Sequence, residues 1–494
     1  MEKLKIFMFS DIFVNIKSLL LDNKTVKQTI FKNTFWLALA EGLSKFFMLI
    51  LLVYVARVLG ATEYGKFTFA LAFVSLFVIF SNFGLSNITI REFSRERKKE
   101  KEFPAIFTLK VLLSIATLIL ILLISFLVTS NIGIQRVIWV LAIFTVIKSF
   151  SEIIYAFLRA RQQMQYEALA KILEAVVLVG AGFFVILNFP SIQNLSYSYL
   201  FASIITTIFI LLFFHFKFFS LKLSFKKSIW KNFLLMSWPL GFVAVFATIY
   251  NQIDSVMMGY FGQITENGWY NAAHKLTSAA LIPTQLIFTS FFPVLSIAFK
   301  GSKERLQMVW DHRAGMTILI AVPLVIGGVA LASKIINFFY NPSFSPSILV
   351  FQILIITTGI IYFISPLSQA LIISNQQKKN FWITFCGAMT NIILNLILIP
   401  KYSLYGAAIA TLITVSLMLV LYFISTNKFT TVRPLNFRVL LTVFSAFLCS
   451  IPMYFAISRP PIYNLNILLS VLIGSAIYLV SFLILNNFLR LKII

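Results

Sequence analysis

The chain has 494 residues, of which 60% are hydrophobic and only 12% are charged, and its mean hydropathy is +0.93. A soluble protein would carry about 25% charged residues, so this composition excludes an ordinary soluble protein and indicates a polytopic membrane protein. The formal net charge of +25 does not indicate a nucleic-acid partner, because the 41 Lys and Arg residues stand in short groups between apolar runs, where membrane topology places them.

Many stretches of the chain are apolar and long enough to cross a membrane, since about 20 helical residues span about 30 Å of hydrocarbon. In chain order they are 33–55, 66–88, 104–128, 135–158, 168–188, 195–216, 233–258, 269–294, 314–339, 347–373, 381–399, 404–426, 437–457 and 464–488. The segment 1–32 carries lysines, and its short apolar stretch is interrupted by Asp11 and Lys17, so we expect a cytoplasmic segment without a cleavable signal peptide. The sequence therefore predicts an all-α polytopic membrane protein with about 14 transmembrane helices.

Positive charges between these spans predict their orientation. With the N-terminus in the cytoplasm, 32 of the 41 Lys and Arg residues lie on the inner side, 6 lie on the outer side and 3 lie within spans. This bias follows the positive-inside rule, and one missed or spurious span would exchange the two sides of every later loop. We therefore expect both termini to be cytoplasmic.

Two turns of similar sequence indicate an internal repeat. VLGATEYGKF (58–67) follows the first span and YFGQITENGWY (260–270) follows the seventh. Both contain a glycine, a short polar turn with Glu, a second glycine and an aromatic residue that enters the next helix. Six spans separate the two starting helices, and an even number keeps the orientation, which predicts parallel repeats related by an axis along the membrane normal. Chance convergence of two glycine-rich turns is the alternative, and the shared place in the chain favours the repeat.

Seven charged residues inside the predicted spans are candidates for a site, because a charge costs about 2.5–3.5 kcal/mol at the bilayer centre. They are Glu41, Lys45, Lys148, Glu152, Glu174, Asp254 and Lys275. Glu41 with Lys45 and Lys148 with Glu152 are each four residues apart, so each pair shares a helix face and is able to neutralise itself in part. Lys45 and Lys148 lie near the middle of their spans, too deep to reach the headgroups easily.

These charges have two interpretations. Glu152 and Glu174 lie nearer the inner ends of their spans, where acidic side chains reach the headgroups or join two helices through an ion pair. The functional alternative is a water-filled cavity in which the lysines meet an anionic substrate and the acids hold a coupling ion, H⁺ or Na⁺. Asp254, beside Asn251 and Gln252, is the outer candidate. His274, next to Lys275, titrates near neutral pH or is simply an interface residue.

Motifs for catalysis or metal binding are absent from the sequence. Cys386 and Cys449 lie in apolar runs and offer neither a disulfide framework nor metal-ligand spacing. There is no phosphate-binding loop, nucleophile elbow, HExxH motif or acidic cluster, and the longest inner loops have only about 15–20 residues. We therefore expect no enzyme activity, no catalytic residue and no metal site.

Three stretches, taken in order, carry a family resemblance. They are NTFWLALAEGLSKFFMLILLVYVARVLGATEYGKFTFALAFVSLFVIFSNFGLSNITIREFSR (33–95), WPLGFVAVFATIYNQIDSVMMGYFGQITENGWYNAAHKL (238–276) and NIILNLILIPKYSLYGAAIATLI (391–413). They resemble the opening of the polysaccharide-unit flippases, the opening of their second half, and their late Asn-rich helix with its Pro turn and Gly-Ala-Ala helix start. These flippases are lipid-linked oligosaccharide exporters of the multidrug/oligosaccharidyl-lipid/polysaccharide exporter superfamily. The resemblance covers nearly the whole chain.

The resemblance implies two six-helix lobes, 33–220 and 221–430, around a central cationic cavity, with two additional helices in 431–494. It also implies alternating access that moves an isoprenoid-diphosphate-linked oligosaccharide from the cytoplasmic to the outer leaflet for cell-surface glycan biosynthesis. The sugar would cross in the wet cavity while the lipid tail stays in the bilayer. We expect a monomeric, multi-pass protein of a prokaryotic plasma membrane, without a cofactor other than a coupling H⁺ or Na⁺. Glycan polymerases and glycosyltransferases are candidate partners.

Roles are assigned to residues by position and charge, because the binding residues of this family vary. Contact with the diphosphate is assigned to Lys45, Lys148 and Lys275, and guidance of the headgroup at the cavity mouth to Arg91. Coupling or charge balance is assigned to Glu41, Asp254, Glu152 and Glu174. The polar candidates of the cavity are Asn251, Gln252, His274, Asn391 and Asn395.

Two other functions stay open. A multidrug exporter coupled to protons or sodium would favour an acid-dominated cavity that accepts cations, whereas the deepest residues here are lysines balanced by acids. A membrane scaffold for glycan-building enzymes would keep its function after every deep charge is neutralised. Efflux of cationic dyes and charge-neutralising substitutions separate these functions from the flippase.

Overall fold

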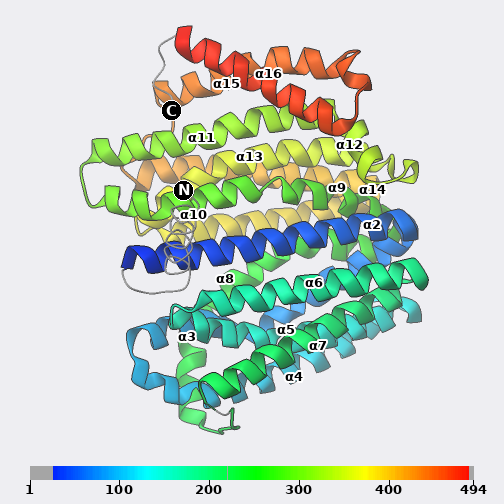
Figure 1. Cartoon of the computed structure of the whole chain (residues 1–494), viewed down its shortest axis with the longest axis vertical. Coiled ribbons are helices and arrows are strands. Elements are labelled where there is room, and N and C mark those ends of the chain that lie inside the picture. The colour runs from blue at the N-terminus through cyan, green and yellow to red at the C-terminus, as the bar shows by residue number, and fades with distance from the viewer. Residues whose placement is uncertain (1–25, 220, 489–494) are drawn as a thin grey trace, which may run out of the picture. The chain divides into compact units, whose positions relative to one another are not determined.

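A computed structural model describes residues 26–219 and 221–488, and every regular element within these ranges is a helix (Figure 1). In this part of the chain, 12 helices are long and apolar enough to cross a membrane by length and composition. The prediction of an all-α polytopic membrane protein is therefore confirmed. Most of the predicted cytoplasmic segment 1–32, and the tail 489–494, lie outside the described residues.

Two helices are long enough to hold two of the predicted spans each. α2 (Val26–Asn82) has 57 residues and α14 (Gln377–Phe429) has 53, more than twice the length of about 20 residues that one crossing needs. Each contains one residue outside the helical conformation, Gly60 at φ 77° in α2 and Ser403 at φ 53° in α14. Glycine has no Cβ, so Gly60 adopts this positive φ without strain. The predicted spans fall on either side of these two residues, and the number of crossings stays a prediction.

Unit 1, the first of two compact units, comprises the described residues up to Leu51 together with Val74–Val245. Besides part of α2, its elements are α3 (Leu85–Arg95), η1 (Arg97–Glu102), α4 (Phe103–Val128), α5 (Ile132–Ala160), α6 (Met164–Asn188), α7 (Ile192–Lys217) and the first part of α8 (Lys227–Tyr260). α5 packs against α3, α4 and α7, and α7 also packs against α6. α5 is therefore the central helix of this unit.

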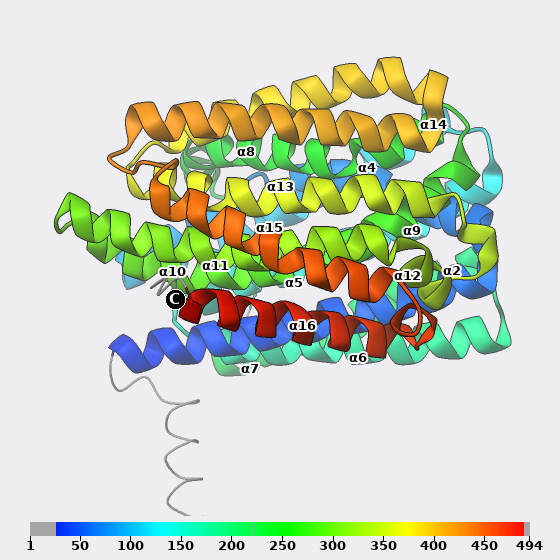
Figure 2. The same cartoon turned by 90° about the horizontal axis from the view of Figure 1, so that it is seen from above.

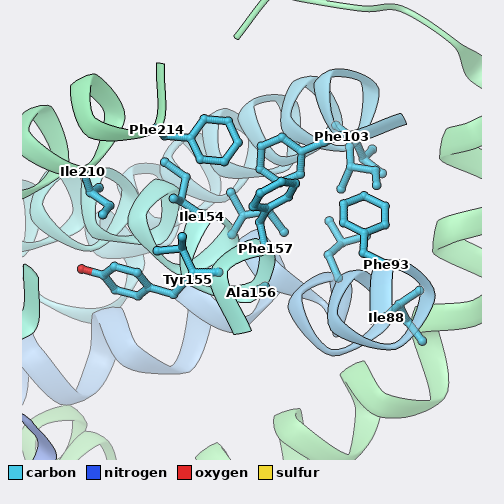
Figure 3. Packing of buried hydrophobic residues seen from close by; sticks show 14 of the residues in the cluster. Ile88, Phe93, Phe103, Ile154, Tyr155, Ala156, Phe157, Ile210 and Phe214 are labelled. Carbon is cyan, nitrogen blue, oxygen red and sulfur yellow. The ribbon is translucent and has the colours of Figure 1, made fainter. Parts of the chain in front are cut away.

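An aromatic core holds one end of α5 in place (Figure 3). The ring of Phe157 lies 5.1 Å from that of Phe103 and 5.0 Å from that of Phe214, both in edge-to-face geometry or close to it. Such pairs contribute about 0.5–1.5 kcal/mol each beyond area burial, which matters in a membrane, where helices associate through close packing. Tyr155 lies about 200° around the helix from Phe157, and its hydroxyl points away from the labelled phenylalanines (Figure 3).

Unit 2 comprises Leu52–Phe73 and the described residues from Phe246 onward. Besides the remaining parts of α2 and α8, it contains α9 (Ile264–Ala279), α10 (Ile282–Phe299), α11 (Lys303–Ala330), α12 (Ala332–Phe339), η2 (Pro342–Phe344), α13 (Ser347–Ile373), α14, α15 (Phe437–Ser458), η3 (Ile462–Asn464) and α16 (Ile467–Phe488). α13 packs against α14, α11 and α9. α15 packs against α11 and lies beside α16 (Figure 2).

The two similar turns of the sequence meet each other within unit 2. A Cβ atom on Gly65 would collide with the backbone carbonyl of Ile264, and a Cβ atom on Gly268 would collide with the backbone carbonyl of Ala61. Only glycine allows two backbones to approach so closely. The contact is reciprocal, as two-fold related repeats require.

Side chains at the same place extend this contact. The hydroxyl oxygens of Thr62 and Thr265 lie 2.9 Å apart, and Asn267 donates a hydrogen bond of 2.9 Å to the carbonyl of Gly65. The segment Leu52–Phe73 of α2 therefore belongs to unit 2, and Val245 rather than residue 220 ends unit 1. The units are defined by packing, and the two six-helix lobes, 33–220 and 221–430, stay a prediction.

Candidate functional site

A polar cavity of about 210 Å³ lies in unit 1 between α2, α5 and α6. Its charged and hydroxyl-bearing walls include Glu41, Lys148, Glu152, Tyr155, Lys171 and Glu174. The remaining wall is mainly aliphatic and includes Met48 and Leu178. A cavity with this many ionisable groups inside a membrane-spanning bundle marks a functional site by default, because charges in the hydrocarbon region are expensive.

Helical periodicity places these side chains on the cavity. Lys148, Glu152 and Tyr155 follow the i, i+4, i+7 pattern of a single face of α5. Lys171 and Glu174 lie three residues apart on one face of α6. α6 begins after a short turn that follows α5, so the charged faces of these consecutive helices meet.

Cross-helix ion pairs dominate the cavity. Lys148 of α5 donates to Glu174 of α6 at 2.6 Å, and Lys171 of α6 donates to Glu41 of α2 at 2.6 Å. Lys171 also lies 3.0 Å from a carboxylate oxygen of Glu167, whose side chain is completely buried. These pairs tie three helices together, and the loss of one partner of such a pair leaves an uncompensated charge.

The ion pairs continue toward the end of α5. Arg159 donates to both carboxylate oxygens of Glu167, at 2.7 and 2.5 Å. Two parallel hydrogen bonds of this kind fix the orientation of both groups. Arg161 makes the same two-point contact with Glu100 of η1, and its guanidinium lies 4.9 Å from the centre of the Phe157 ring. These contacts fix the end of α5 and connect to the cavity through Lys171, which also pairs with Glu167.

Two polar groups on the cavity wall have no protein partner. Within the described residues, the carboxylate of Glu152 accepts no hydrogen bond and forms no ion pair. The hydroxyl of Tyr155 is buried, with the residue 1% exposed, and it also lacks a hydrogen-bond partner. Buried polar groups are normally satisfied, so the enclosed Tyr155 hydroxyl calls for an explanation, and the half-buried Glu152 carboxylate is accessible to a ligand.

Four of the predicted site residues are brought together in this cavity, namely Glu41, Lys148, Glu152 and Glu174. Their pairing differs from the one that sequence spacing suggested. Lys148 bonds to Glu174 of the next helix rather than to Glu152 on its own helix, and Glu41 bonds to Lys171. Helix spacing defines a shared face, but it does not say which neighbouring helix that face meets.

Two other predicted residues of unit 1 do not line the cavity. Lys45 is exposed on α2. Arg91 lies on α3, donates to Glu92 at 3.0 Å and contacts the sulfur of Met236. Its side chain is exposed, so it stays a candidate for contact with a headgroup only as a proposal.

Sequence reasoning also missed buried cations. Lys171 is not among the site residues predicted from the sequence, although it lies in the cavity. Lys110 is not among them either, yet it is completely buried in α4 and donates to the Ser81 carbonyl at 2.8 Å. Arg313 is completely buried in α11 and donates to Ser365 at 2.7 Å. Any Lys or Arg near a span end looks like a topology signal, so only side-chain burial separates these residues from the rest.

A second polar cluster lies in unit 2 around the buried carboxylate of Asp254. Tyr270 of α9 and Asn395 of α14 each donate to it at 2.5 Å, and Thr411 of α14 donates at 3.0 Å. Asn395 also donates to Asn391 at 3.1 Å. All partners of this carboxylate are neutral, and a buried charge without a counter-charge is unfavourable. The cluster is therefore suited to take up a proton or a monovalent cation.

The remaining predicted residues of unit 2 do not bond to this carboxylate. Asn251 donates to the backbone of its own helix at 2.6 Å, and Gln252 is half-buried on α8. The ring of His274 stacks on that of Tyr270, with the centres 5.9 Å apart. Lys275 is half-buried on α9. Only Asn391 and Asn395 of the predicted polar residues join Asp254.

The many apolar helices and the two polar sites inside the bundles define a multi-pass membrane transporter. Residues 30–299 match the family described as "Polysaccharide biosynthesis protein". The chain therefore belongs to the polysaccharide biosynthesis protein family, in agreement with the family resemblance of its sequence. Curated relatives whose names describe probable flippases agree with the expectation that the chain is not an enzyme.

Curated relatives agree with this family. The chain is 22% identical over 390 residues to the "Probable low-salt glycan biosynthesis flippase Agl15" of Haloferax volcanii, a match that covers 77% of this chain and 80% of the relative. It is 19% identical over 403 residues to the "Capsular polysaccharide biosynthesis protein CapF" of Staphylococcus aureus, covering 79% and 98% of the two chains.

Solved structures show the same fold. The lipid II flippase MurJ in an inward closed conformation has a TM-score of 0.74 at 18% identity, covering 91% of this chain and 99% of its own. An inward-facing multidrug resistance transporter of the MATE family has a TM-score of 0.66 at 15% identity, covering 81% and 95%. At these identities the likeness concerns the fold alone.

Proposed function

We propose that this protein is a flippase that moves an isoprenoid-diphosphate-linked oligosaccharide from the cytoplasmic to the outer leaflet by alternating access. Membership of the polysaccharide biosynthesis protein family supports this function. The observation that carries it is the cavity of unit 1, in which two lysines, Lys148 and Lys171, face a polar space inside a membrane-spanning bundle.

The cavity chemistry suits a diphosphate. An ammonium group binds phosphate oxygens through short, charge-assisted hydrogen bonds. Lys148 is 41% exposed, so its ammonium is accessible from the cavity while Glu174 holds it. A diphosphate that enters competes with Glu174 for the lysine, and on release the carboxylate takes its place again. The exchange keeps the lysine paired in both states, and the cost of leaving Glu174 without its counter-charge while the diphosphate is bound favours release.

The two ends of the substrate follow different routes in this proposal. The oligosaccharide is polar and needs the wet cavity, whereas the isoprenoid chain is apolar and stays in the bilayer. The setting that we propose is the plasma membrane of a prokaryote, with a monomeric protein and glycan polymerases or glycosyltransferases as partners in the same pathway.

Asp254 is the proposed coupling group. Its carboxylate is buried and held by Tyr270, Asn395 and Thr411, which are all neutral donors. Uptake of H⁺ or Na⁺ neutralises the carboxylate and so favours one conformation over another, which links an ion gradient to transport. The sequence offers no nucleotide-binding motif as another energy source.

A multidrug exporter is the second candidate, because Glu152 is a carboxylate without a partner and a cationic drug would bind there. The two functions differ in what is transported. Robust efflux of cationic dyes without any glycan export would support the exporter. A scaffold would keep glycan assembly intact in every charge-neutral variant.

The test is export of a surface glycan in cells that depend on this protein. Lys148→Ala is expected to lower export at least about tenfold, since one lost charge-assisted contact changes affinity by that factor. Lys45→Ala tests the other predicted cation, and Lys401→Ala, an exposed lysine on α14, is the control. Membrane abundance is measured for each variant. Unchanged export in Lys148→Ala would overturn the role of the cavity lysine, whereas Lys45→Ala tests a lysine outside the cavity.

A further inference from the structure

The groups of the unit 1 cavity that have no protein partner point to a more specific role. Glu152 and Tyr155 lie three residues apart on α5, on the face that carries Lys148. The Tyr155 hydroxyl is buried without a hydrogen-bond partner, and Glu152 is unpaired although two lysines line the same cavity. An orphaned buried hydroxyl in a native protein needs an explanation, and a ligand that bonds to it is one.

We infer that Glu152 and Tyr155 form the sugar-binding part of the substrate site, beside the lysines that hold the diphosphate. This inference rests on the proposed function and names the residues that make the site selective for a glycosylated lipid. The part of the substrate that these residues would bind is the sugar attached directly to the diphosphate. Its hydroxyl groups, or an amide N–H group, supply the hydrogen-bond donors.

The chemistry of the two residues separates the parts of the substrate. An ionised carboxylate only accepts hydrogen bonds, so the group that Glu152 binds must donate them. A diphosphate has no donors to offer and is repelled by the carboxylate, whereas neighbouring sugar hydroxyls donate to both carboxylate oxygens. The Tyr155 hydroxyl either donates to a ring or hydroxyl oxygen or accepts from a hydroxyl.

The surroundings favour a neutral sugar over a cation at Glu152. Lys148 and Lys171 are each paired with another carboxylate, so Glu152 is not needed to balance their charges. Met48 and Leu178 supply an apolar wall, which suits the C–H face of a sugar ring. Along α5, Glu152 lies about 6 Å and Tyr155 about 10 Å from Lys148 at 1.5 Å rise per residue, so a sugar at these two residues would lie beside a diphosphate at Lys148.

Binding of two probes to the purified full-length chain in lipid nanodiscs tests the inference. The probes are farnesyl diphosphate and the same lipid diphosphate linked to N-acetylglucosamine. We expect Glu152→Gln and Tyr155→Phe each to weaken binding of the sugar-bearing probe about tenfold, the effect of one hydrogen bond to a charged or buried group. Binding of farnesyl diphosphate stays unchanged or becomes tighter in Glu152→Gln. Lys148→Gln is expected to weaken the binding of both probes.

Tyr155→Phe is the cleaner variant, because its hydroxyl has no protein partner to lose and the thermal stability should not fall. Tyr340→Phe, which removes a buried hydroxyl bonded to the Ala272 carbonyl of unit 2, is the matched control and leaves both affinities unchanged. The sugar site would be overturned if Glu152→Gln and Tyr155→Phe weakened the binding of both probes equally or weakened neither. The flippase function would stand in that case.

Two further outcomes separate this inference from the proposed function. Failure of the unmodified chain to bind either probe would overturn the proposed function itself, and the sugar site with it. Binding of the cationic dye ethidium that Glu152→Gln abolishes, with the sugar probe unaffected, would replace the sugar at Glu152 by a cation.

Discussion

The ion pair between Lys148 and Glu174 should respond unequally to the loss of its two partners. The lysine side chain is 41% exposed, the glutamate side chain is 11% exposed, and their charged atoms lie 2.6 Å apart. Lys148→Gln leaves a carboxylate that is almost fully enclosed and has lost its counter-charge. Glu174→Gln leaves an ammonium on a long, flexible side chain that reaches water in the cavity by itself.

The magnitudes follow from this difference in exposure. Breaking a buried pair costs about 3–5 kcal/mol when the remaining charge stays buried, whereas an exposed pair contributes only about 0.2–1 kcal/mol. We expect Lys148→Gln to lower the free energy of unfolding by about 2–3 kcal/mol, because the enclosure of Glu174 is not complete, and Glu174→Gln to lower it by less than about 1 kcal/mol. The double variant removes both charges and should lie within about 1 kcal/mol of the unmodified chain.

Unfolding in mixed detergent micelles, followed by circular dichroism with increasing dodecyl sulfate, measures all four proteins. A coupling free energy then follows from the double-mutant cycle, which isolates the pair from other effects of each substitution. Equal losses in the two single variants, or a double variant whose loss is their sum, would refute the pairing and the enclosure of Glu174.

Three further perturbations test other parts of the structure. Gly65→Ala places a methyl group against a backbone carbonyl of α9 and should lower the free energy of unfolding by about 1–3 kcal/mol. Gly180→Ala in α6 is the control, because nothing lies within 4 Å of the added Cβ atom, and it should raise the free energy of unfolding by up to about 1 kcal/mol. An unchanged stability of Gly65→Ala would contradict the close contact. Phe157→Ala should cost about 3–5 kcal/mol and exposed Phe184→Ala far less in the same assay, and equal costs would argue against the aromatic core. Asp254→Asn keeps the shape of the side chain, and transport in vesicles should lose its dependence on the H⁺ or Na⁺ gradient; retained dependence would exclude this coupling group.

Apolar length was sufficient to predict the helices, because the bilayer sets how many apolar residues a crossing needs and forbids other backbone structures. The points at which one helix turns into the next were harder to define. Gly60 and Ser403 each interrupt a long helix at a single residue. Pro400 marked the second turn in the sequence, but nothing singled out Ser403 as the residue with positive φ.

The candidate sites were predicted in part. The spacing of Lys148 and Glu152 correctly indicated a shared polar face, but the partner of Lys148 is on α6, and contacts between helices are not visible in one sequence. Gln252 is two residues from Asp254 in the chain. Residues two positions apart on a helix point about 200° away from each other, so proximity in sequence did not bring Gln252 to the carboxylate. Tyr270 and Thr411 come from other helices, and nothing in the spacing of the sequence assigns them to Asp254.

Transport by the reconstituted protein tests the role of the unit 1 cavity most directly. The substrate is a fluorescent polyisoprenoid-diphosphate-linked N-acetylhexosamine in proteoliposomes, and its movement between leaflets is read by chemical quenching from outside. The unmodified chain should move the label, and the Lys148→Gln/Glu174→Gln double variant, which keeps its stability, should move it at least about tenfold more slowly. An unchanged rate in that variant would contradict the account of the cavity as the diphosphate site.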